Sequence, residues 1–218
     1  MTTNSAIRRQ RKNYSLPSEA LPVLNRMVGA RITKFKSGTR YTSIDDILKE
    51  KAQYKEWNLP DGFHGQPYFL VFDNRETVVL YYDEFLGSIV LRAIERDVDE
   101  DLFFETLENQ DQMGFRTSIK SAIDLPGESN FSGKIINSLS IYKLPTNFYV
   151  KPTAYDLINE CVICMEVSDI GDVLFVCEVA TKENPGGKME NIRLANWENL
   201  DHTAVAELSC IWSSSSVT

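Results

Sequence analysis

The chain has 218 residues, of which 43% are hydrophobic and 25% charged, with a formal net charge of −8. This length and composition are typical of a globular protein with a sizeable core and exclude disorder throughout the chain. No apolar run approaches the roughly 20 residues of a membrane helix, and the first residues lack the apolar stretch of a secretory signal. We therefore expect a cytoplasmic protein with no membrane partner.

The charge is divided unevenly along the chain. Residues 1–40 hold nine cations against one acid, Glu19, so they carry +8 and the remaining residues carry −16. Four of these cations, Arg8, Arg9, Arg11 and Lys12, fall within five residues in a polar segment without periodicity. The pattern predicts a basic N-terminal arm over residues 1–16 in an acidic protein.

The residues after the arm show helical patterns. The spacing of Leu21, Leu24 and Met27 predicts a helix that has Ser18 as its N-cap and Gly29 as its stop. Residues 31–35 suit a short strand, and residues 42–58 suit a second helix that Ser43 caps.

Residues 67–85 read as a β-hairpin, because two runs of aromatic and β-branched residues flank the turn residues Asp73 and Asn74. After the hairpin, Leu86, Val90, Ile94 and Val98 recur at intervals of four, which predicts a helix. Residues 99–114 read as a further helix that closes on Gly114.

The C-terminal part has a strand-like pattern. After a brief helix over residues 152–160, four strand candidates follow, at residues 161–167, 172–182, 190–197 and 204–212. Two of the links between them are rich in turn residues, so neighbouring strands are expected to pair antiparallel.

These elements predict an α+β fold. Helices lie mainly in the N-terminal half, an antiparallel β-sheet of about four strands fills the C-terminal half, and the early hairpin is added to them. The predicted domains are the arm, 1–16, and one α+β domain, 17–218, with a split near residue 126 as the alternative.

The sequence gives little support for a metal site or for reactive thiols. Cys161 and Cys164 have the CxxC spacing, but strand alternation places them on opposite faces, and Cys177 and Cys210 are isolated. We therefore interpret all four as reduced, buried thiols and expect no metal or other cofactor. Residues 97–108 approach a calcium loop, yet Leu102 stands where the turn needs glycine.

Catalytic motifs are also incomplete. No serine lies in a glycine-flanked elbow, and "PGGK" at residues 185–188 lacks the rest of a phosphate-binding loop. The histidines are His64 and His202, and an enzyme would have to assemble one of them with distant partners. An enzyme with a dispersed active site therefore stays an alternative, and no catalytic residue can be named.

The arm has a charge-matched segment elsewhere in the chain. Residues 95–111 contain eight acids and only Arg96 as a cation. The acids are Glu95, Asp97, Asp99, Glu100, Asp101, Glu105, Glu108 and Asp111. Opposite charges of this kind steer protein association, so the sequence predicts a non-catalytic interaction or assembly protein of the accessory, viral or phage-like, or immunity type. Its partner would be a protein, either heterologous or a second copy in a homo-oligomer.

Two other interpretations of the arm are open. A nucleic-acid-binding protein would contact phosphates through the arm and a patch formed by Arg26, Arg31, Lys34, Lys36 and Arg40, although a body of −16 repels a polyanion. A mitochondrial transit peptide also suits an acid-free, arginine-containing start, but the amphipathic helix that such peptides need is not evident.

Overall fold

The structure is a computed structural model. It describes residues 14–39, 68–83, 86–94, 121–123, 131–146, 148, 158–183, 185 and 192–216. The predicted helices at residues 42–58 and 99–114 lie outside these ranges, as does most of the brief helix predicted over residues 152–160.

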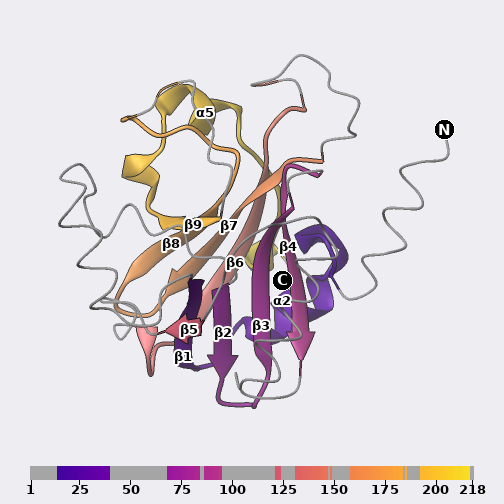
Figure 1. The fold of residues 1–218 in the computed structure, drawn as a ribbon, viewed down its shortest axis with the longest axis vertical. Helices are drawn as coiled ribbons and strands as arrows, with labels where there is room; N and C mark the ends of the chain where they lie inside the picture. The colour runs from indigo at the N-terminus through magenta and orange to yellow at the C-terminus, as the bar shows by residue number, and fades with distance from the viewer. Residues whose placement is uncertain are drawn as a thin grey trace, which may run out of the picture.

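Two antiparallel sheets make up about half of the described chain (Figure 1). The first contains β1 (Ile32–Thr39), β2 (Tyr68–Phe72), β3 (Thr77–Asp83), β4 (Ser88–Ile94) and β5 (Ser121–Ile123), in the order β4-β3-β2-β1-β5. The second contains β6 (Ile136–Lys143), β7 (Glu160–Val167), β8 (Gly171–Val176), β9 (Arg193–Ala195) and β10 (Ser209–Ser213), in the order β10-β6-β7-β8-β9. Each sheet is thus a four-stranded meander whose fifth strand pairs with the first.

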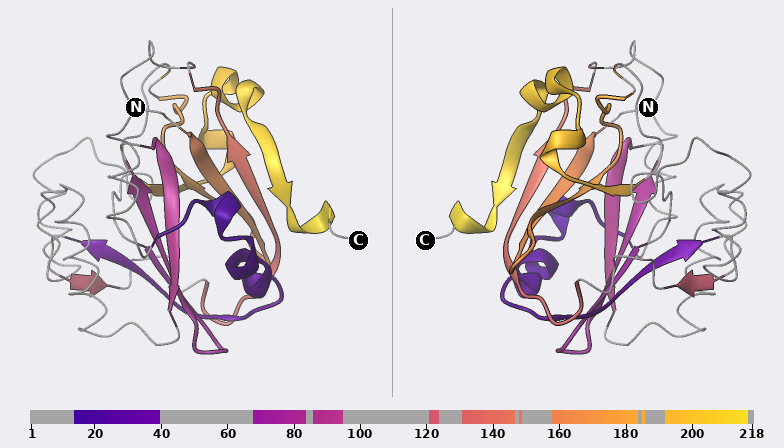
Figure 2. Two further views of the ribbon diagram at one scale, coloured as in Figure 1. Left: turned by 90° about the vertical axis from the view of Figure 1, so that its right-hand side faces the viewer. Right: turned by 90° about the vertical axis from the view of Figure 1, so that its left-hand side faces the viewer.

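The sheets face each other as two layers of a β-sandwich (Figure 2). The ring of Phe175 on β8 lies 6.0 Å from that of Phe35 on β1 and 5.5 Å from that of Tyr68 on β2, measured between centroids. The buried apolar residues of both inner faces form one core cluster. Aromatic edge-to-face contacts of this kind join the two layers.

Two α-helices are present among the described residues, α2 (Leu21–Met27) and α5 (His202–Glu207). Leu24 and Met27 bury one side of α2 in the core. The predicted stop is confirmed: Gly29 adopts φ +81°, and its N–H donates to the carbonyl of Ile136 at 2.8 Å. Asp201 caps α5 by accepting hydrogen bonds from the N–H groups of Thr203 and Ala204.

Three short 3-10 turns complete the described elements: η1 (Pro17–Glu19), η3 (Trp197–Asn199) and η4 (Ser214–Ser216). No helix of the described ranges is long and apolar enough to cross a membrane.

The predicted α+β class is wrong, because β-strands dominate both halves. Within the helix predicted from Leu86 to Val98, the described residues instead form β4, which pairs with β3 from Ser88 to Ile94. Residues 88–91 of β4 are buried without a break, so the strand lacks the polar alternation of a half-exposed one. A strand that is buried on both faces is apolar at nearly every position. Some of its apolar residues therefore also fall at helical intervals, which produced the wrong prediction.

Other predicted elements have a mixed outcome. The hairpin is confirmed, with β2 and β3 joined by a turn at residues 73–76. The strand predicted over 204–212 divides into part of α5 and part of β10, and the strand predicted over 172–182 ends at Val176. Ser18 is not the cap of α2, whose N-cap position is occupied by Ala20.

Candidate interaction surface

The residues that end the predicted arm are held against β4. We call Tyr14–Leu16 the strap. Ser15 and Leu91 exchange two backbone hydrogen bonds, Ser15 N–H to Leu91 O at 2.9 Å and Leu91 N–H to Ser15 O at 2.8 Å. The strap therefore covers the edge of the first sheet at this point, and unpaired edges are where strands of other chains add.

Side chains fix the strap in place. Leu16 is 7% exposed and packs with Val79, Tyr81 and Val90 on the outer face of the first sheet. The ring of Tyr14 meets that of Tyr81 edge-on, with 4.6 Å between centroids. A shift of one residue would turn Leu16 away from this cluster, so its burial fixes the register of the strap on β4.

Ser18, which follows the strap and Pro17, is hydrogen-bonded to the second sheet. Ser18 donates its N–H to one carboxylate oxygen of Glu160 at 2.9 Å and its hydroxyl to the other at 2.6 Å. Glu160 begins β7 and is 4% exposed, and its own N–H donates to the hydroxyl of Ser88 on β4. This chain of bonds links the N-terminal segment, the first sheet and the second sheet.

Other buried carboxylates also bond within the protein. Glu76, at the β2–β3 turn, accepts hydrogen bonds from the guanidinium of Arg26, the shorter at 2.5 Å. The hydroxyl of Tyr82 donates to Glu178, which follows β8. Asp83 Oδ1 accepts from the N–H of Leu86 at 3.2 Å. Burial of a carboxylate is tolerated where such donors replace water.

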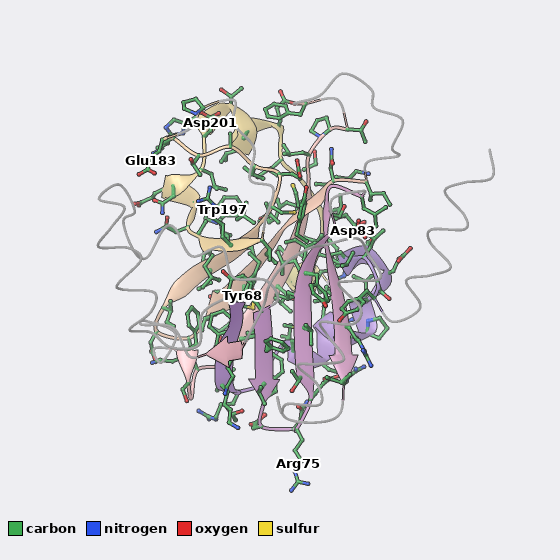
Figure 3. All side chains as sticks on the ribbon, in the orientation of Figure 1. Tyr68, Arg75, Asp83, Glu183, Trp197 and Asp201 are labelled. Atoms are coloured by element: carbon green, nitrogen blue, oxygen red, sulfur yellow. The ribbon has the colours of Figure 1, made fainter. Side chains whose placement is uncertain are left out.

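The predicted cationic patch is described in part. Arg26 is bonded to Glu76, and Arg31 Nη1 donates to the carbonyl of Gly133 at 2.6 Å. Lys34 and Lys36 lie on β1 opposite Val71 and Phe69. Arg26 and Arg31 therefore make contacts within the protein. Arg75, which sequence reasoning did not select, is exposed at the β2–β3 turn and extends from the end of the sandwich opposite to Asp201 (Figure 3).

The remaining predicted site residues lie outside the described ranges. They are Arg8, Arg9, Arg11, Lys12, Arg40, His64 and the eight acids from Glu95 to Asp111. His202 is described; it is the first residue of α5, and its side chain is exposed.

Three of the four thiols are buried, as expected, but Cys210 is exposed on β10, which corrects the prediction for that residue. Burial raises the pKa of Cys161 to about 12. Burial, followed by the negative charge of Asp172, raises the pKa of Cys164 to about 12. These two thiols stay protonated near neutral pH and are poor nucleophiles.

A shallow pocket of about 160 Å³ lies between β9 and η3, where Lys182, Glu183, Arg193 and Glu198 contribute to the lining. Typical ligand pockets are roughly 300–1,000 Å³. In the parts of the chain that the structure describes, no group of three or more His, Cys, Asp or Glu residues is arranged to hold a metal ion.

The described residues thus define an antiparallel β-sandwich protein with a strapped sheet edge. No protein-family model, characterised protein or solved structure matches this chain, so its function has to be inferred from its own residues. The sequence had not indicated the contacts of Ser15 with Leu91 or of Ser18 with Glu160. No local pattern identifies partners that lie 142 residues apart, as Ser18 and Glu160 do.

Proposed function

We propose that this chain is a non-catalytic protein-interaction or assembly protein, in which the basic arm acts against an acidic surface. One observation carries the proposal: the strap holds the root of the arm beside β4, and the acidic segment 95–111 follows directly after β4. The described residues next to the two oppositely charged segments, Tyr14 in the strap and Ile94 at the end of β4, therefore belong to neighbouring backbone segments. Clustered opposite charges steer association and select partners.

The described interior supports a structural role for its polar groups. Glu76, Glu160 and Glu178 each accept a hydrogen bond from another side chain, and Arg26 is bonded to one of them. Thiols held protonated by burial add no nucleophile. These groups maintain the fold, so the arm and the acidic segment are the better candidates for contact with other molecules.

Light scattering after size exclusion, with absorbance at 260 and 280 nm, tests the proposal. The full chain is compared at low and high salt with a form lacking residues 1–13, which keeps the strap on β4. An Arg9→Gln/Arg11→Gln variant is compared with Arg75→Gln/Lys182→Gln, which removes the same charge from exposed positions of the folded body.

We expect an oligomer that dissociates with salt, with loss of residues 1–13 and with Arg9→Gln/Arg11→Gln, but not with the control variant. Exposed charge pairs are screened over about 8–10 Å at 0.1–0.15 M salt, which explains the salt dependence. A monomer under every condition would contradict the assembly form of the proposal. A strong 260 nm absorbance that disappears with the arm would favour nucleic-acid binding instead.

A further inference from the structure

The outermost strands of the two sheets differ in how their edges are protected. β4 carries Arg92 and is covered by the strap at Leu91, and β5 and β9 are each three residues long. Coverage, charge and short length are common ways in which proteins keep a sheet edge from pairing with another chain. β10 is five residues long and contains no charged residue. No strand among the described residues pairs with its outer side, and Figure 2 shows it at the edge of the second sheet, close to the C-terminus.

β10 also presents apolar surface at this edge. Residues 209–211 are exposed, and Ile211 retains 43% of its surface in contact with water. Cys210 and Trp212 have partners on β6, whereas the pairing register skips Ile211, as at a β-bulge. A bulge redirects the side chain at its position. Packing within the sandwich therefore leaves a large apolar side chain uncovered on an edge strand.

The sequence around Ile211 suits pairing with a second copy of the chain. In an antiparallel pair centred on Ile211, every residue of β10 lies opposite a residue of β10 in the second copy, and all of these residues are uncharged. Glu207, the nearest charged residue in the described chain, falls opposite Ser215. No like charges of these strands face each other, although each copy carries a net charge of −8.

We propose that β10 pairs antiparallel with β10 of a second copy, about a two-fold axis at Ile211, and so joins the second sheets of two protomers into one continuous sheet. Backbone hydrogen bonds between the strands supply affinity, and burial of Ile211 against its own copy removes apolar area from water. The interface goes beyond the proposed function, because it uses neither the arm nor the acidic segment. Since it contains no charged residue, the dimer persists at salt concentrations that dissociate arm-dependent contacts.

Sedimentation velocity of the full chain over a range of protein concentrations tests this interface. High salt suppresses contacts of the arm, and a reductant prevents Cys210 from linking two copies covalently. Ile211→Lys places a charge at the centre of the proposed strand pair. Ile170→Lys is the matched control, because Ile170 is a large apolar residue of similar exposure, 39%, in the turn between β7 and β8.

We expect a dimer whose Kd rises at least about tenfold in Ile211→Lys and stays unchanged in Ile170→Lys. Ile211→Glu should weaken the dimer in the same way, and an equal mixture of the Ile211→Lys and Ile211→Glu variants should dimerise again, because opposite charges then meet at the axis. Circular dichroism checks that each variant keeps its fold.

A monomer at every concentration would overturn the proposal, as would a dimer that Ile211→Lys weakens no more than Ile170→Lys does. A dimer that the mixture fails to restore would overturn pairing about Ile211. The arm variants of the light-scattering comparison leave β10 intact, so failure of the proposed function and failure of this interface are seen separately.

Discussion

Ser18 donates two hydrogen bonds to the carboxylate of Glu160, at 2.9 and 2.6 Å, and so connects the segment after the strap to the first residue of β7. Glu160 is buried and its N–H is bonded to Ser88 of the other sheet. Removing a donor from a buried carboxylate leaves part of its desolvation uncompensated. This bond is therefore a sensitive place to test how the N-terminal segment is held.

Ser18→Ala is expected to lower the free energy of unfolding by about 1–3 kcal/mol, because the buried carboxylate loses its hydroxyl donor. Ser138→Ala is the matched control, since Ser138 donates to the exposed Glu166 at 2.8 Å. Urea denaturation followed by tryptophan fluorescence measures both variants. Equal losses in the two would contradict the role of the Ser18–Glu160 bond.

Arg26→Ala is expected to destabilise the protein more than Lys134→Ala. The side chain of Glu76 is 7% exposed and stays buried without its guanidinium donor, whereas Asp169, the partner of Lys134, is 78% exposed and returns to water. We expect about 1–3 kcal/mol for the first change and less than about 0.5 kcal/mol for the second. Thermal and urea unfolding of the two variants check the order, and an inverted order would refute it.

Tyr82→Phe removes the hydroxyl that donates to Glu178, and both residues are buried. A loss of about 1–3 kcal/mol is expected from urea unfolding. The control is Tyr142→Phe, because Tyr142 on β6 is only half-buried. If Tyr82→Phe lowers the free energy of unfolding by no more than this control does, the buried hydrogen bond adds nothing to stability.

Stability should fall at alkaline pH because of Cys161 and Cys164. Burial raises both pKa values from 9.0 to about 12, so the unfolded thiols ionise first. The stabilisation is complete below pH 9 and is lost as the pH rises towards 12, by up to about 1.4 kcal/mol per pH unit for each thiol. Urea unfolding between pH 8 and 10 should show a smaller slope in Cys161→Ala than in Leu139→Ala, which is a core truncation without a thiol. The same slope in both variants would contradict the prediction.

The thiols also give a direct check of burial. Cys210 should react with a thiol reagent in the native protein, and Cys161, Cys164 and Cys177 should react after unfolding. Cys210→Ser should remove the native reaction. A fast native reaction in that variant would show that one of the buried cysteines is accessible.

Local sequence was sufficient for some elements. Asp73 and Asn74 marked the β2–β3 turn because the backbone there needs residues that tolerate tight turns, and the N–H of Glu76 does bond to the side chain of Asn74. Gly29 marked the end of α2 because its φ of +81° favours glycine. The division of charge between the first 40 residues and the rest is likewise a property of the sequence alone.

The identity of β4 and the long-range hydrogen bonds of the N-terminal segment depended on tertiary structure. β4 looked helical because burial of Ile89, Val90 and Leu91 on both faces removes the alternation that identifies a strand. The pairings of Ser15 with Leu91 and of Ser18 with Glu160 join segments far apart in the chain, and hydrogen-bond partners at such separations leave no periodicity in the sequence. Composition and charge thus established an acidic chain of globular composition whose cations are concentrated in the first 40 residues. Only the tertiary structure determined that the strap pairs with β4 and that Ser18 is bonded to Glu160.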